Sequence, residues 1–462
     1  MALFAIDLND AAITVVGPDG IAMAEPGYAP GYAATVDGRL LFGMDAWKES
    51  RLHPRSTANG FWSDFSEDPL AREFAGCSSS ADLAHVHLEA LLAGLPSRPA
   101  AALIVVPPNW TTRQLGLLLG IAEDIALPIR GLVDPAVAAT RGEYAGHRLL
   151  HIDSGLQSST ITRLDQHGRV SLGERQVVER VGIMQLERAC VTFIAGRFLQ
   201  ATRFDPAHDA RSEQYLYDNL YAWIRDVDRQ EEVGLTIEFG ANEFGTTIRR
   251  ADLAARVADA FEPVARQIRS SVSAGEQVAI QVSARLAEFP GVVEALAKLP
   301  QASVFVLDQA AGAIGALQRE QCFMPTGGGV GLTTTLPWDR TVAVAQDSSV
   351  PADFEPEIVE PTHVFYGGNV YRLTSAPFNI GVELAAGEYG LQLGASLGGV
   401  SRRHCSIRRG QNGVELADHS RFGTKLNGHA IDGAVVLQAG DIVTIGSPPV
   451  QLRLVREIGS RD

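Results

Sequence analysis

One local pattern occurs twice in this chain, and it constrains the fold more than any other feature of the sequence. Ile6-Asp7-Leu8-Asn9 follows an apolar run at the N-terminus, and Ile152-Asp153-Ser154-Gly155 follows a second apolar run of the same kind. Each pattern predicts a buried strand, an aspartate at its end, a tight turn and a second extended segment. A single aspartate in this place commonly does no more than start a turn. Two of them predict duplicated halves around a phosphate-binding cleft, in which turn N–H groups contact phosphate and the two carboxylates hold hydrated Mg²⁺.

Residues 1–320 alternate short apolar runs with amphipathic segments. Runs such as Leu103–Val106 and Val278–Val282 lack polar alternation, as expected for strands that are covered on both faces. Leu253, Val257 and Phe261 recur every four residues and share one face of a predicted helix. Strands interleaved with helices predict an α/β architecture for this part of the chain.

The chain changes character near residue 320, and we expect a linker over residues 321–364. The stretch from residue 346 to 362 holds five carboxylates, three prolines and no Lys or Arg, a composition typical of a solvated linker. From residue 365 to 462, short runs such as Val414–Leu416 and Ile442–Ile445 are separated by Gly, Asn and Asp. This spacing predicts a small all-β sandwich.

Residues 1–320 resemble the actin-like ATPase superfamily, and most closely the DnaK-type chaperone ATPase. Besides the two aspartate turns, the resemblance rests on Val105-Val106-Pro107-Pro108, Asp134-Pro135-Ala136, Ile237-Glu238-Phe239 and the segment from Asp308 to Ala313. It implies a two-lobed α/β fold with duplicated halves and a cleft for ATP and Mg²⁺. The positions that it matches to catalytic ones are Asp7, Asp134 and Asp153, which we take as vestigial candidates only, and we assign no catalytic residue. Those that it assigns to the nucleotide are Asp7, Asn9, Asp10, Asp153, Gly155, Ser158 and Gly312.

The cleft departs from the pattern of the family at several positions. Asn9 stands where the family has Gly, and Asp10 stands where it has a hydroxyl. A carboxylate at ~4 Å from a phosphate charge costs about 1–4 kcal/mol. Leu156-Gln157 replaces further glycines, the catalytic Lys of the family aligns near Trp62, and Ser283-Ala284-Arg285 replaces the Gly-Gly beside adenine. The sequence therefore predicts a degenerate cleft that binds ATP and Mg²⁺ weakly or not at all, and we assign no metal site.

Residues from about 365 to 456 resemble the forkhead-associated domain, a β-sandwich that recognises phosphothreonine. The resemblance rests on Gly394, Ser401-Arg402-Arg403-His404, the segment from Asp418 to Thr424, Asn427-Gly428 and Gly440-Asp441. It implies a phosphopeptide site made of Ser401, Arg402, Arg403, Arg421 and Phe422. Hydroxyl and guanidinium groups suit such a site, since charge-assisted donors bind anions strongly.

Two positions of this segment depart from the forkhead-associated pattern. Ala395 stands where the family has an Arg that grips phosphate, and Phe422 stands where many members have an Asn that holds the ligand backbone. Binding that depends on phosphothreonine, protein binding without phosphate and a purely structural module therefore all remain open. We expect His404 to support the loop through a buried hydrogen bond rather than to touch the ligand.

Charge and hydropathy exclude several classes of function. The chain has 39 Lys and Arg against 54 Asp and Glu, a net charge of −15, which disfavours sequence-independent binding to nucleic acid. Its apolar runs are shorter than the ~20 residues of a membrane helix, and the N-terminus lacks the pattern of a secretory signal. We therefore expect a cytoplasmic scaffold or adaptor that recruits a protein partner, with or without phosphothreonine, and that does not insert into membranes. The alternative is an ATP-dependent conformational switch with weak ATPase activity.

Overall fold

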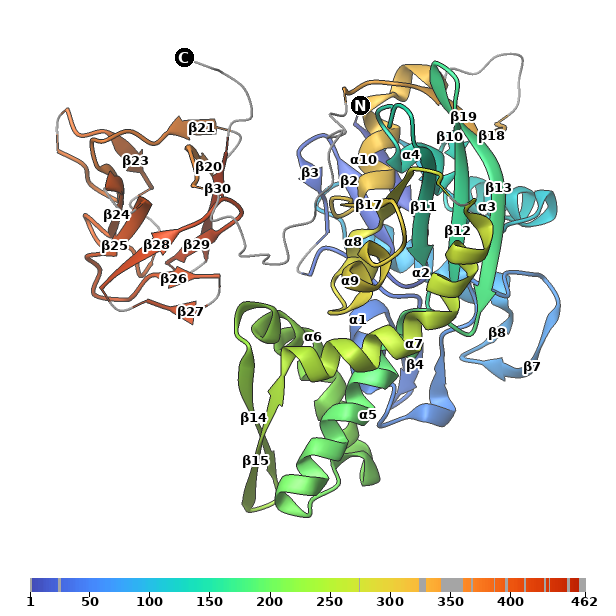
Figure 1. The fold of residues 1–462 in the computed structure, drawn as a ribbon, viewed down its shortest axis with the longest axis horizontal. Coiled ribbons are helices and arrows are strands. Elements are labelled where there is room, and N and C mark those ends of the chain that lie inside the picture. The colour runs from blue at the N-terminus through green and yellow to red at the C-terminus, as the bar shows by residue number, and fades with distance from the viewer. Residues whose placement is uncertain are drawn as a thin grey trace. The chain divides into compact units, whose positions relative to one another are not determined.

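The computed structural model divides the chain into two compact units, Met1–Ser348 and Ser349–Asp462 (Figure 1). The residues that it describes are 2–23, 26–273, 275–323, 330–341, 360–366, 369–385, 387–394, 398–410, 413–427, 429–431, 433–446 and 449–456. Each unit has its own hydrophobic core and is described by itself below.

The first sheet of the N-terminal unit has six strands in the order β18-β10-β9-β1-β2-β3. These strands are β1 (Leu3–Asp7), β2 (Thr14–Gly17), β3 (Gly20–Ile21), β9 (Ala101–Val105), β10 (Ile129–Val133) and β18 (Leu332–Thr333). From β3 to β1 the neighbours are antiparallel, and from β1 to β18 they are parallel. The antiparallel turn between β1 and β2 places Asp7 at the edge where the parallel strands end.

The second sheet repeats this arrangement. Its order is β17-β16-β11-β12-β13-β19, with β11 (Arg148–Ser154), β12 (Ser158–Gln166), β13 (Arg169–Glu179), β16 (Val278–Val282), β17 (Ala302–Val306) and β19 (Thr335–Pro337). Here too an antiparallel run, β13 to β11, is followed by parallel neighbours, β16 and β17. The strand order from β3 to β10 thus recurs from β13 to β17, so Asp7 and Asp153 lie at equivalent positions.

Helices cover these sheets, and the mixed α/β character that the sequence predicts is present. The helices are α1 (Gly43–Glu49), α2 (Ser80–Ala93), α3 (Thr112–Asp124), α4 (Pro135–Ala139), α5 (Ile183–Thr202), α6 (Ala210–Arg229), α7 (Arg250–Ser271), α8 (Ala284–Ala287), α9 (Val292–Ala297) and α10 (Ala311–Gln318), with short 3₁₀ turns η1 (Pro54–Ser56), η2 (Pro206–His208) and η3 (Glu320–Phe323). Ser79 and Thr111 begin α2 and α3 with capping boxes, which satisfy the first free N–H groups of each helix. The predicted apolar face of α7, including Leu253, Val257 and Phe261, is fully buried.

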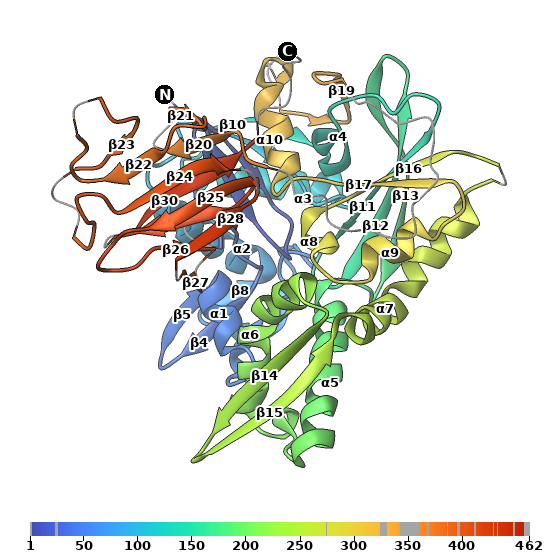
Figure 2. The same cartoon turned by 60° about the vertical axis from the view of Figure 1, so that its left-hand side comes forward.

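Smaller strands complete the N-terminal unit. They are β4 (Ala33–Val36), β5 (Arg39–Phe42), β6 (Thr57–Ala58), β7 (Pro69–Phe74), β8 (Cys77–Ser79), β14 (Glu232–Phe239) and β15 (Asn242–Arg249). The hairpin of β14 and β15 extends beside α5, as both views of the ribbon show (Figures 1 and 2).

The end of the N-terminal unit differs from the expected boundary at residue 320. Part of the expected linker belongs to the unit, because β18 pairs with β10 and β19 pairs with β13, and Leu336 of β19 is buried. Strands of two or three residues carry no periodic signal that a sequence pattern could reveal. The rest of that linker, residues 324–329 and 342–359, lies outside the described residues.

The C-terminal unit is a β-sandwich of one six-stranded and one five-stranded sheet, with the orders β21-β20-β30-β29-β26-β27 and β23-β22-β24-β25-β28 (Figure 2). The strands are β20 (His363–Tyr366), β21 (Asn369–Arg372), β22 (Phe378–Gly381), β23 (Gly390–Gln392), β24 (Cys405–Gly410), β25 (Gly413–Asp418), β26 (Lys425–Leu426), β27 (His429–Ala430), β28 (Ala434–Leu437), β29 (Ile442–Ile445) and β30 (Val450–Val455). Phe378, Ile407, Leu416 and Val443 are among the fully buried side chains between the sheets. Ala395 and Gly428, which the sequence analysis singles out, lie outside the described residues.

Candidate functional site

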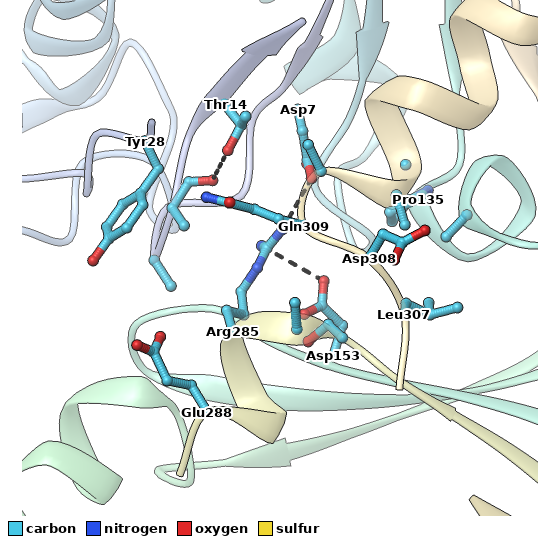
Figure 3. A pocket seen from close by; sticks show the side chains of 18 of the residues that line it. Asp7, Thr14, Tyr28, Pro135, Asp153, Arg285, Glu288, Leu307, Asp308 and Gln309 are labelled. Carbon is cyan, nitrogen blue, oxygen red and sulfur yellow. Dashed lines mark hydrogen bonds and ion pairs between the residues drawn. The ribbon is translucent and has the colours of Figure 1, made fainter. Parts of the chain in front are cut away.

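The two equivalent aspartates face each other across a cavity of about 410 Å³ in the N-terminal unit (Figure 3). Asp7 and Asp153 are both buried, and the guanidinium of Arg285 lies between them. Its Nη2 is 3.0 Å from Oδ2 of Asp7, and its Nη1 is 3.7 Å from Oδ2 of Asp153. Arg285 comes from α8, directly after β16 of the second sheet, so this ion pair joins the second sheet to the first.

Burial and charge act in opposite directions on these groups. Burial raises the pKa of Asp7, and Asp153 adds to this effect, whereas Arg285 partly opposes it. Burial alone would lower the pKa of Arg285, but the carboxylates of Asp153 and Asp7 outweigh it and hold that pKa above its usual value. Arg285 therefore stays charged and is the counter-ion of a buried pair of acids.

The turn after β1 also reaches across to the second sheet. Asn9 donates from Nδ2 to Oδ2 of Asp153 at 3.1 Å and to the carbonyl of Ser154 at 3.2 Å. Asp10 accepts the backbone N–H of Leu156 at 2.8 Å and the hydroxyl of Ser63 at 3.0 Å. Burial raises the pKa of Asp10, whereas the hydrogen bond from Leu156 opposes that shift.

Gly155 is required here by the close approach of Asp10. A Cβ atom at Gly155 would lie 2.5 Å from Oδ1 of Asp10, which no side chain could tolerate without displacing that carboxylate. Gly155 also donates its N–H to the carbonyl of Ser158 at 2.9 Å and so closes the turn between β11 and β12. The space beside the second turn is therefore filled by a side chain of this chain.

Asp134 caps a helix and forms an ion pair. Its Oδ1 accepts the N–H groups of Ala136 and Val137 at the start of α4, and its Oδ2 lies 2.6 Å from Nη2 of Arg175. Arg175 also donates to Thr162 and to the carbonyl of Pro108, so the guanidinium is held in place from several sides. Both carboxylate oxygens of Asp134 are thus engaged in structural contacts.

The predicted cleft residues divide into two groups. Asp7, Asp153 and Gly312 line the cavity, and Gly312 lies in α10 close to Asp7. Asn9, Asp10, Asp134, Gly155 and Ser158 are not among the residues that line it.

Two positions that the sequence analysis compared with the family have specific contacts in the fold. Trp62, which aligns near the catalytic Lys, is buried in the core, where its Nε1 donates to Nδ1 of His87 and its ring stacks on Phe65 and Trp110. In the sequence, Arg285 stands where the family has glycine, and that comparison does not predict its ion pairs with both aspartates. The sequence signal that could have indicated this pairing is a cation, Arg285, placed just after the predicted strand Val278–Val282.

In the C-terminal unit, His404 ties two loops together. The backbone N–H of Ser401 donates to Nδ1 of His404 at 3.1 Å, and Nε2 of His404 lies 3.3 Å from the carbonyl of Gly423. His404 is fully buried, and burial lowers its pKa, so the imidazole is neutral with the proton on Nε2. The expected supporting role of His404 agrees with these contacts.

The same two loops meet a second time at Ser401. Its Oγ accepts the backbone N–H of Arg421 at 3.2 Å. Asp418 holds the second loop by accepting from Ser420 and Thr424. Burial acts to raise the pKa of Asp418, but these hydrogen bonds outweigh it and lower that pKa.

The arginines of these loops are not equally available to a ligand. Arg402 pairs with Glu383 at 3.4 Å, and Arg403 pairs with Glu388. Arg421 forms no ion pair with any acidic side chain in the described part of the chain. Phe422 beside it has 71% of its surface exposed. The structure thus brings Ser401, Arg421 and Phe422 together and leaves Arg402 and Arg403 engaged with glutamates.

The family comparison addresses this same region. Residues 391–446 match the family model of the FHA domain, the forkhead-associated domain, and the match includes both loops described above. The C-terminal unit carries an FHA domain. The match does not extend into the N-terminal unit, and no curated protein is significantly similar to the chain.

Two further findings concern the described residues as a whole. None of the helices in those parts of the chain is both long enough and apolar enough to span a membrane. Within the same parts, no cluster of three or more His, Cys, Asp or Glu side chains is arranged to hold a metal ion.

Proposed function

We propose that this protein is an adaptor whose FHA domain recruits a partner that carries phosphothreonine, and whose N-terminal unit is a non-catalytic member of the actin-like superfamily. The observation that carries the proposal is the meeting of Ser401 and Arg421 within a segment that matches the FHA family. FHA domains are modules of protein interaction, so a protein partner follows from the domain itself.

The geometry at Ser401 suits a phosphate. Because Oγ of Ser401 accepts the N–H of Arg421, its own hydroxyl proton is left to donate to a phosphate oxygen. The side chain of Arg421, whose backbone contacts this hydroxyl and which forms no ion pair among the described residues, supplies a charge-assisted donor. A phosphothreonine carries about −1.5 to −2 charges at neutral pH, so it can accept charge-assisted hydrogen bonds from both groups. Unmodified threonine has no such charge to offer them.

The contacts in the N-terminal unit support a scaffold rather than an enzyme. The repeated strand order supports the duplicated halves that the proposal assumes, and Asp7 and Asp153 occupy equivalent strand ends. Both oxygens of Asp134 are engaged, by the helix cap and by Arg175, so orienting a water molecule would compete with these structural contacts. The alternative, an ATP-dependent switch, would first have to break these contacts and those of Arg285.

A binding experiment with the full chain tests the proposal. A degenerate phosphothreonine peptide library and its unphosphorylated counterpart are presented to the wild type, to Ser401→Ala and to Arg421→Ala. We expect enrichment from the phosphorylated library only. A hydrogen bond to a charged group contributes about 1.5–3 kcal/mol, so each variant should bind roughly 10- to 150-fold more weakly.

Arg408→Ala is the matched control for these variants. Arg408 is an exposed arginine on β24 that pairs with Glu415, so its removal changes the net charge as Arg421→Ala does, without touching the two loops. Equal enrichment from both libraries would contradict phosphate dependence and favour a phosphate-independent interaction. Unchanged affinity in both Ser401→Ala and Arg421→Ala would place the partner on another face of the sandwich.

A further inference from the structure

The cleft of the N-terminal unit satisfies its own charges. Within the described residues, Arg285 is the cation that forms ion pairs with Asp7 and Asp153. Two buried carboxylates that face each other repel strongly unless a cation lies between them. The guanidinium fills that position, as the dashed contacts in Figure 3 show.

The turn between β11 and β12 also has a counter-charge from within the chain. The backbone N–H of Leu156, in the turn between β11 and β12, is a donor that a bound phosphate could use. In the structure this N–H donates to the carboxylate of Asp10, and Ser63 donates to the other oxygen of that carboxylate. A phosphate group could reach the N–H of Leu156 only by displacing Asp10.

All of these contacts join the two sheets. Arg285 and Leu156 belong to the second sheet and its connections, whereas Asp7 and Asp10 belong to the first sheet and its first turn. Asn9 adds a further link through its hydrogen bonds to Asp153 and Ser154. The residues present therefore do not fit Mg²⁺ and ATP, the groups that an actin-like fold implies.

We propose that Arg285 and Asp10 are built-in counter-ions. The guanidinium takes the place of a divalent cation between Asp7 and Asp153, and the Asp10 carboxylate takes the place of a phosphate on the turn after β11. Together they hold the two halves of the unit in one arrangement without metal or nucleotide. This inference goes beyond the adaptor role, because it concerns how the scaffold keeps its shape.

Thermal unfolding of the full chain tests the role of Arg285. All five tryptophans lie between residues 47 and 338, so tryptophan fluorescence reports the N-terminal unit alone. We expect the wild-type midpoint to be the same in a chelator, in millimolar Mg²⁺ and in Mg²⁺ with ATP. Arg285→Ala leaves the paired carboxylates uncompensated, so its midpoint in the chelator should fall by roughly 5–10 °C. Millimolar Mg²⁺ should restore part of that loss.

Three further variants separate this role from a general structural one. Arg285→Lys keeps a cation, so its unfolding midpoint should fall less than that of Arg285→Ala. The midpoint of Arg285→Lys should not change when Mg²⁺ is added. Arg225→Ala removes a cation that lines the same cavity but pairs with Glu288, and its midpoint should not respond to Mg²⁺ either. The double variant Arg285→Ala with Asp10→Ser frees the N–H of Leu156. Its unfolding midpoint should therefore be higher in Mg²⁺ with ATP than in Mg²⁺ alone.

Several results would overturn the proposal. A wild-type midpoint that rises with Mg²⁺ or with Mg²⁺ and ATP would show that the cleft is not self-satisfied. An Arg285→Ala midpoint equal to that of the wild type and unchanged by Mg²⁺ would show that Arg285 is not the counter-ion. If Arg285→Ala does not fold, Arg285→Ala with Asp153→Asn removes the repulsion and should fold without a response to Mg²⁺. A continued failure to fold would contradict the charge argument.

Discussion

His404 offers the most quantitative test of how the FHA loops are built. The substitution His404→Ala removes the acceptor of the Ser401 N–H and the donor to the Gly423 carbonyl. Each of these hydrogen bonds contributes about 0.5–1.5 kcal/mol, and a buried partner left without one costs about 1–3 kcal/mol. Because Ser401 is only partly buried and water can reach it, we take the lower part of these ranges. The free energy of unfolding should fall by about 2–4 kcal/mol.

The same histidine makes the stability of the unit depend on pH. The pKa of His404 in the folded state is lowered from 6.5 by burial, so below pH 6.5 the unfolded state binds more protons than the folded state. The contribution of His404 is therefore full above pH 6.5 and is lost as the pH falls through the lowered folded pKa. The pKa of Asp418 is also lowered, but its contribution is lost only below its usual value of 3.8. Between these two values the contribution of His404 changes, whereas that of Asp418 is still full.

Urea denaturation of residues 349–462, followed by far-ultraviolet circular dichroism at pH 7.5 and pH 5, measures both effects. The wild type should be less stable at pH 5, and this difference should shrink in His404→Ala. His419→Ala is the control, because the exposed His419 ring hydrogen-bonds the Ser406 hydroxyl and its backbone bond to His404 survives the substitution, so the stability should change by less than about 0.5 kcal/mol. A loss of less than about 1 kcal/mol in His404→Ala, or an unchanged pH dependence, would refute the reasoning.

Two further substitutions test the cleft. Gly155→Ala forces a Cβ to within 2.5 Å of Asp10 and should destabilise the N-terminal unit by about 1–3 kcal/mol. In the Asp10→Ala background, the same substitution should cost much less stability. Additive losses of stability in this double-mutant cycle would contradict the close contact. Asp134→Ala leaves Arg175 without its anion and should cost about 3–5 kcal/mol. Asp134→Asn keeps an oxygen for the helix cap and should cost less stability than Asp134→Ala. Chemical denaturation measures both losses, and equal losses of unfolding free energy would argue against the cap.

The sequence predicted most where the signal was local. The apolar run before Asp7 and the one before Asp153 both form strands, and the apolar spacing of Leu253, Val257 and Phe261 identifies the buried face of α7. In the C-terminal sandwich, strands such as β25 and β29 follow from short β-like runs between turn residues, whereas β20 begins inside the expected linker and β22 was not predicted. In each case the deciding information lies within a few neighbouring residues, since strand and helix periods are short.

The features of the fold and the cleft that the sequence did not predict depend on contacts between residues far apart in the chain. Arg285 meets Asp7 across 278 positions of sequence, and no local pattern encodes that pairing. The sequence predicts that the carboxylate of Asp10 repels phosphate, whereas in the fold this carboxylate accepts a hydrogen bond from the distant N–H of Leu156. The short strands β18 and β19 add to the two sheets from within the expected linker, because they complete sheet edges whose strands lie far earlier in the chain.

The two candidate sites differ in how far their charged groups already have partners, and this difference favours the adaptor over the switch. At the cleft, the cation Arg285 and the anion Asp10 each have partners within the chain, so a ligand would have to replace contacts that exist. At the FHA loops, Arg421 has no acidic partner among the described residues and Phe422 is largely exposed, so a ligand can add contacts without breaking any. Because binding free energy comes from the surplus of new over lost interactions, the larger gain is expected at Arg421.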